Sequence, residues 1–282
     1  MWGPSARRSI RFAEEPEAIC AHEQDVFQVA SELIKGPSHF ITFKSPSATH
    51  RIFVVRPSPK SRRIAIAEFG TTRLRDIFAR VYINQDCAVR QGFYRSIRDQ
   101  PLFASLAGQI FKNHVLLWLW HSNVAPTCTC ATANSPYLDM SLCRDNLKFF
   151  YKAEELKGIS EPKTHICLVP TSQTFPTLDA VILTSSAVIT VQITIALKHD
   201  ADEQEFNLIY RNLPPDLLAK RPGRYHVFIT DNDINARSLR EQNHTQIPDG
   251  TLVYSTARCF EDLDYVTEER MYALDKARVS LY

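Results

Sequence analysis

Glycine is scarce in this chain, with 8 glycines in 282 residues, and they occur singly. Neither Gly-x-Gly-x-x-Gly nor Gly-x4-Gly-Lys-Ser/Thr is present. Those motifs allow the backbone to approach the phosphates of dinucleotides and of nucleoside triphosphates. The sequence therefore predicts no nucleotide cofactor.

Long apolar runs are also missing. The longest, from Val115 to Trp120, is far shorter than the roughly 20 residues that a transmembrane helix needs. The basic residues near Met1 are not followed by the apolar stretch of a secretory signal. We expect no membrane partner and no secretory signal, which leaves an intracellular location as the simplest expectation.

Neither cysteine nor net charge points to a particular class of protein. The seven cysteines are an odd and scattered set, so they predict no complete disulfide framework. Lys and Arg total 33 against 31 Asp and Glu, so overall charge does not require a nucleic-acid or membrane partner. With 44% apolar residues, a chain of this length can bury a sizeable core.

The pattern of elements becomes regular after about residue 100. We expect residues 1–95 to form an N-terminal segment, the remnant of a domain that precedes the core, and residues 96–282 to form an α/β domain. Periodicity and turn residues predict, in order, a helix over 101–121, strands over 147–151, 178–183 and 188–197, a helix over 202–212 and a strand over 225–230. This order is α-β-β-β-α-β.

Two of these strands predict a hairpin that turns at Ser185-Ser186. In that register Asp179 lies across from Gln192, and strand alternation places Thr194 on the same face. The alternate positions are apolar and point into a core. A carboxylate beside an amide oxygen can hold a divalent metal next to a phosphodiester. The other interpretation of this pattern is a half-exposed sheet whose outer face is solvated.

A family resemblance favours the metal site. The stretches that carry it are Phe175–Ile182, Val191–Thr194, Lys198-His199, Tyr225–Thr230, Ala236–Gln242, Val253–Ser255 and Ser105–His114. In their order and spacing over about residues 100–260, they resemble the C-terminal nuclease-type domain of Crinkler and retrotransposon-hot-spot proteins. The resemblance implies a restriction-endonuclease-like PD-(D/E)xK core with a mixed central sheet flanked by helices.

The same resemblance implies the site residues. Asp179 and Gln192 would hold Mg²⁺ or Mn²⁺, and Thr194 and His199 would assist the hydrolysis of phosphodiesters. Lys198, at the end of the same strand, would contact nucleic acid or replace the missing motif lysine.

Three residues depart from the family pattern and weaken the catalytic interpretation. Lys112 takes the place of a helix Glu that many of these enzymes use as a metal ligand, and a cation there repels a metal. Gln192 replaces a carboxylate, and Thr194 stands where a lysine would stabilise the phosphorane. Asp179 is left as the only anionic ligand of the motif.

Lys220, Arg221 and Arg224 form a small basic cluster, for which we expect either contacts with the phosphate backbone or a solvated face. Two functional hypotheses follow. In the first, the chain is a Crinkler-like effector or toxin that hydrolyses DNA or RNA in a host nucleus. In the second, a catalytically degenerate module keeps the fold and acts by binding nucleic acid or protein. A third alternative is an intracellular domain whose polar hairpin face is only structural.

Overall fold

The computed structural model describes residues 16–36, 51–58, 61–121, 128–130, 138, 140, 147–160, 165–171, 175, 178–198, 203–243, 247 and 250–263. The chain divides into two compact units, residues 1–110 and 111–282, and helix α7 (Ala104–His121) spans the division. The domain boundary at residue 95 stays a prediction.

The first unit combines one β-hairpin with helices. Its elements are α2 (Pro16–Lys35), β1 (Phe53–Ser58), β2 (Ser61–Phe69), α5 (Thr72–Ile83), α6 (Cys87–Arg98) and the 3-10 helix η1 (Pro101–Phe103). Phe53 lies at its centre, with ring centroids of Phe69, Phe78 and Phe103 within 4.9–6.2 Å. Tilted and edge-on aromatic contacts of this kind stabilise the unit beyond their buried area.

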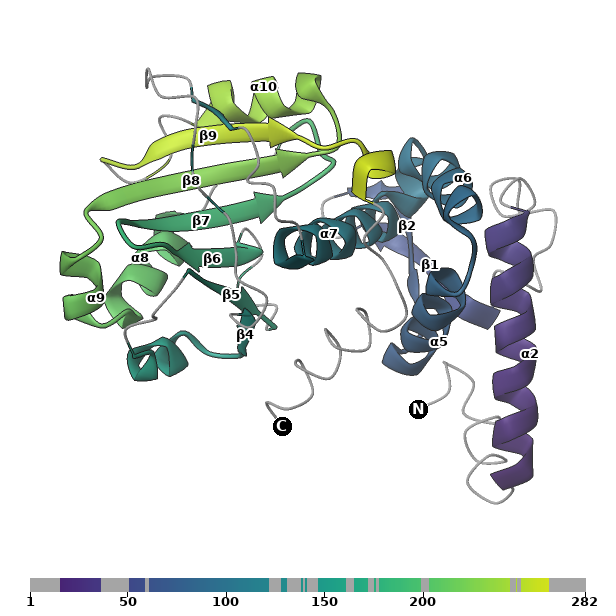
Figure 1. Cartoon of the computed structure of the whole chain (residues 1–282). Coiled ribbons are helices and arrows are strands. Elements are labelled where there is room, and N and C mark those ends of the chain that lie inside the picture. The colour runs from purple at the N-terminus through teal and green to yellow at the C-terminus, as the bar shows by residue number, and fades with distance from the viewer. Residues whose placement is uncertain are drawn as a thin grey trace. The chain divides into compact units, whose positions relative to one another are not determined.

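The second unit is built on a mixed seven-stranded sheet with the order β3-β9-β8-β7-β6-β5-β4 among the described residues (Figure 1). The strands are β3 (Thr129–Cys130), β4 (Leu147–Phe150), β5 (Ile166–Pro170), β6 (Ala180–Leu183), β7 (Ala187–Ile193), β8 (Gly223–Thr230) and β9 (Leu252–Ala257). β6 and β3 run antiparallel to the other five strands. The predicted α/β class with a mixed sheet is confirmed.

The predicted hairpin register is also confirmed. Val181 pairs with Thr190 and Leu183 pairs with Val188. Thr184 closes the turn, because its hydroxyl accepts hydrogen bonds from the backbone N–H groups of Ser186 and Ala187. The sequence analysis missed β5, which lies between the predicted first strand and the hairpin and pairs with β6.

Helices connect the later strands. These are α8 (Glu203–Asn212) and the short α9 (Pro215–Ala219) between β7 and β8, and α10 (Asp233–Asn243) between β8 and β9. The 3-10 helices η2 (Ala153–Gly158) and η3 (Phe260–Leu263) follow β4 and β9. No helix in the described ranges combines the length and the apolar character needed to cross a membrane.

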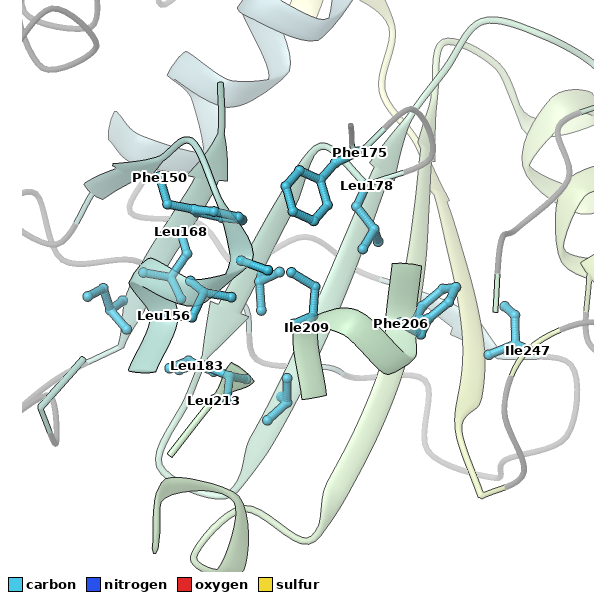
Figure 2. Close-up of a cluster of buried hydrophobic side chains, with 14 of the residues drawn as sticks. Phe150, Leu156, Leu168, Phe175, Leu178, Leu183, Phe206, Ile209, Leu213 and Ile247 are labelled. Atoms are coloured by element: carbon cyan, nitrogen blue, oxygen red, sulfur yellow. The ribbon is translucent and has the colours of Figure 1, made fainter. Parts of the chain in front are cut away.

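The predicted solvated face of the hairpin is wrong. Phe206 and Ile209 on α8 belong to one buried cluster with Val181 and other sheet residues (Figure 2). Thr190 and Gln192 are at most 1% exposed. Because helix α8 covers the face that the sequence marked as polar, both faces of β6 and β7 are buried.

Candidate functional site at the carboxyl ends of the parallel strands

Asp179 lies immediately before β6, at the level where the neighbouring strand β7 ends. Its backbone N–H donates to the carbonyl of Val191 at 2.9 Å. Its Oδ2 accepts a hydrogen bond from the backbone N–H of Ile193 at 2.6 Å. A buried N–H group without an acceptor is costly, so this carboxylate supports the end of β7 directly.

The second carboxylate oxygen of Asp179 is engaged by Lys112. Lys112 Nζ on α7 forms an ion pair with Asp179 Oδ1. The side chain of Asp179 is 12% exposed and that of Lys112 is 32% exposed. The position at which the sequence analysis expected repulsion between Lys112 and a metal therefore holds a charge-neutral pair in a poorly solvated setting.

Gln192 does not lie in an accessible cleft beside Asp179 and Lys112. It is 1% exposed and pairs with Phe228 of β8, a member of the buried cluster beneath α8. On the same strand, Thr190 Oγ1 lies 2.9 Å from His226 Nδ1, and the His226 ring packs edge-on against Phe206. The amide of Gln192 is thus part of a strand buried by helix α8.

Thr194 ends β7. Its N–H donates to the carbonyl of Ile229 at 3.0 Å, and its hydroxyl accepts from the N–H of Ala196 at 3.0 Å. That local turn occupies the hydroxyl at the position where the motif would have a lysine. Lys198 is exposed, and His199 lies outside the described residues.

The predicted basic cluster lies at the other end of the hairpin. Gly223, between Arg221 and Arg224, begins β8 opposite Ala187, the first residue of β7. A seven-residue strand spans about 20 Å, so the structure separates these arginines from Asp179 by about that distance. The two sets of predicted site residues do not converge.

Within the basic cluster, the arginines hold the fold together. Arg221 is 2% exposed, and its Nε donates to the carbonyl of Thr184 at 2.5 Å. Arg224 donates to the carbonyl of Arg221, and its guanidinium lies over the ring of Tyr210 at 5.1 Å. Lys220 is exposed. Arg221 therefore supports the hairpin turn.

The residues present do not form a ligand set for Mg²⁺ or Mn²⁺ in the described part of the chain. Both oxygens of Asp179 already have cationic or N–H partners, and Gln192 is buried. No group of three or more His, Cys, Asp or Glu side chains is placed to hold a metal there.

Sequence reasoning missed a second polar site at the same edge of the sheet. Arg237 and Arg240 on α10 and Arg258 after β9 line one pocket. The spacing of Arg237 and Arg240 places them on one helix face, but such spacing is also that of an ordinary exposed face and does not by itself indicate a ligand. Arg258 follows a strand, and no sequence pattern around it indicates a binding site.

The loop after β8 also contributes polar groups here. Asp231 is 5% exposed, and its Oδ1 accepts hydrogen bonds from the side-chain amides of Asn232 at 2.8 Å and Asn235 at 3.3 Å. Asn235 also donates to the carbonyl of Ile195 at 2.9 Å, and so joins α10 to the segment after β7. In sheets of this type, ligands commonly bind beyond the carboxyl ends of the parallel strands.

Comparisons with known proteins found no match: the chain matches no protein-family model, no curated protein and no solved structure.

Proposed function

We propose that the second unit is a restriction-endonuclease-like module that binds nucleic acid without hydrolysing it. The single observation that carries the loss of hydrolysis is the ion pair between Lys112 and Asp179. A lysine ammonium takes the place that a metal ion would need beside the motif carboxylate.

The order of elements supports the fold part of the proposal. The succession α7, β5, β6, β7, α8 and β8 gives the α-β-β-β-α-β order that the family resemblance implies. The strands β5, β6 and β7 are adjacent and antiparallel in turn, and β8 returns parallel to β7 after a helical crossover. The short elements β3, β4 and η2 are inserted between α7 and β5.

Nucleic acid as the partner rests on the resemblance and on the cationic groups at this edge. Arg237, Arg240 and Arg258 lie there together, and arginine is well suited to phosphate because its planar fork donates two hydrogen bonds. The wider role of an effector or toxin in a host nucleus rests on the resemblance alone.

The test combines cleavage and binding. Plasmid, single-stranded DNA and RNA are incubated with the full chain and Mg²⁺ or Mn²⁺, and retention of labelled DNA and RNA is measured over a range of salt concentrations. We expect no cleavage and a salt-dependent affinity.

The variant Asp179→Asn serves as the control, because it keeps an acceptor for the Ile193 N–H. Metal-dependent cleavage that Asp179→Asn abolishes would establish the nuclease and overturn the proposal. A folded chain that retains neither DNA nor RNA at low salt would also overturn it.

A further inference from the structure

A pocket of about 350 Å³ opens between α10 and the end of β9. It is lined by Asp233, Ala236, Arg237, Arg240, Ser255, Thr256, Ala257 and Arg258. The α10 residues recur every three or four positions, so one face of the helix forms one wall. The segment from Ser255 to Arg258 forms the opposite wall.

The lining is strongly cationic, with three arginines against one aspartate. None of the three arginines forms an ion pair with a carboxylate among the described residues. Arg240 Nη1 lies 3.4 Å from Ser255 Oγ, and the Arg258 guanidinium lies over the Trp118 ring at 4.8 Å. Neither contact neutralises charge, so among the described lining residues the arginines leave an excess of positive charge over Asp233.

Two guanidinium donors inside this region are buried and unused. The Nε atoms of Arg240 and Arg258 are shielded from solvent and donate to none of the residues that the structure describes. Buried donors of this kind are rare in folded proteins, because each loses its hydrogen bonds to water. Because both Nε atoms are closed to a water-sized probe, an anion with several acceptor oxygens would be held by the other guanidinium donors of the lining arginines.

A hydroxyl group in the wall complements such an anion. Ser255 is 2% exposed, and its hydroxyl faces Arg240 of α10, so it is held by β9 rather than by a mobile segment. A tetrahedral oxyanion accepts hydrogen bonds from hydroxyls and guanidinium forks together. Asp233 opposes an anion, but it is exposed at the rim, where solvent screens its charge.

We infer that this pocket binds a phosphate group through Arg237, Arg240 and Arg258. The phosphate belongs either to a nucleic-acid strand, a source that rests on the proposed function, or to a free phosphate ion, a source that does not. The assigned pocket is distinct from Asp179 and from the basic cluster near β8.

The experiment measures two probes on the full chain. Binding of a fluorescent single-stranded oligonucleotide is followed by anisotropy, and binding of inorganic phosphate by calorimetry. The variants are Arg237→Gln, Arg240→Gln and Arg258→Gln. Arg211→Gln is the matched control, because Arg211 is exposed at the end of α8 and does not line the pocket.

We expect each pocket variant to lower the affinity for the probe about tenfold, the loss typical of one charge-assisted hydrogen bond. Arg211→Gln should have little effect on that affinity. Arg237 is exposed, so Arg237→Gln tests the pocket even if a substitution at Arg240 or Arg258 impairs folding. Arg240→Lys keeps the charge but loses the fork, and we expect an intermediate affinity.

The outcomes separate the two proposals. Oligonucleotide binding that the pocket variants weaken supports a nucleic-acid phosphate. Phosphate binding without oligonucleotide binding supports the pocket and overturns the proposed function. Oligonucleotide binding that the pocket variants leave unchanged, or weaken no more than Arg211→Gln does, overturns the pocket alone. Absence of binding to either probe overturns both.

Discussion

The carboxyl ends of β7 and β9 lie at one edge of the same sheet, but the charged side chains near them are paired at β7 and lack an acidic partner at β9 in the described structure. Next to β7, Asp179 and Lys112 neutralise each other, and the second oxygen of Asp179 accepts a backbone hydrogen bond. Next to β9, Arg240 and Arg258 face the same pocket without an acidic partner in the described structure.

The difference distinguishes a charge that takes part in an ion pair within the fold from charges that remain available to bind a ligand. Removing one partner of a partly buried ion pair destabilises the native state, because the other charge is left uncompensated. Neighbouring cations without a partner repel each other and contribute little to folding. Cations grouped in a pocket attract an anionic ligand.

The largest effect is expected from reversing the charge of Lys112. The variant Lys112→Glu places two carboxylates where the ion pair lies, and we expect it to lower the free energy of unfolding by about 2–4 kcal/mol. Urea unfolding monitored by circular dichroism measures the loss.

The same variant allows a direct test with metal. Two adjacent carboxylates form the kind of site that a divalent ion binds, so millimolar Mn²⁺ should restore part of the lost stability. The wild-type chain, in which Lys112 occupies this place, should gain no stability from Mn²⁺. Equal stabilisation of both chains would contradict our account of the ion pair.

The next effect concerns the hydrogen bond from Ile193. We expect Asp179→Ala to cost about 2–3 kcal/mol of folding free energy, since it leaves a buried N–H group and an uncompensated Lys112. Asp179→Asn keeps an acceptor and should cost about 1 kcal/mol. Thermal and urea unfolding of the two variants provide the comparison, and equal losses would argue against a structural role for the hydrogen bond.

The contrast between these positions shows which structural features could be predicted from the sequence. The β-branched runs and the Ser185-Ser186 turn were sufficient for the register of the hairpin, because local spacing determines which residues face each other. The family resemblance placed Lys112 at the motif as a residue that repels a metal, but it did not indicate that Lys112 would form an ion pair with Asp179 itself. Alternation along β7 also could not reveal that α8 would cover Gln192.

The arginine pocket was missed for a related reason. Arg237 and Arg240 have the spacing of an exposed helix face, where charged side chains are common and carry no information about a ligand. Only the fold brings Arg258 from the end of β9 to the same place. β5 was missed because its short apolar run, Ile166–Pro170, lacks alternation and is buried throughout.

A smaller effect is expected in the pocket itself. We expect Arg240→Gln to change the free energy of unfolding by about 0.5 kcal/mol or less, because the lost contact with Ser255 is long and repulsion from neighbouring arginines is relieved. Chemical denaturation without phosphate, compared with that of Lys112→Glu, measures the contrast. A loss as large as that of Lys112→Glu would assign Arg240 to the fold rather than to a ligand.

The smallest effect is expected at the rim of the pocket. Asp233 is the one acidic side chain among the described lining residues, and its carboxylate repels an incoming phosphate across solvent. The variant Asp233→Asn should therefore tighten phosphate or oligonucleotide binding about twofold, the size typical of an exposed charge interaction. This gain in affinity should become smaller as the salt concentration is raised, since salt screens the repulsion between Asp233 and the anion in the wild-type chain. Titrations at two ionic strengths measure it, and unchanged or weaker binding at low salt would show that Asp233 does not oppose the bound anion.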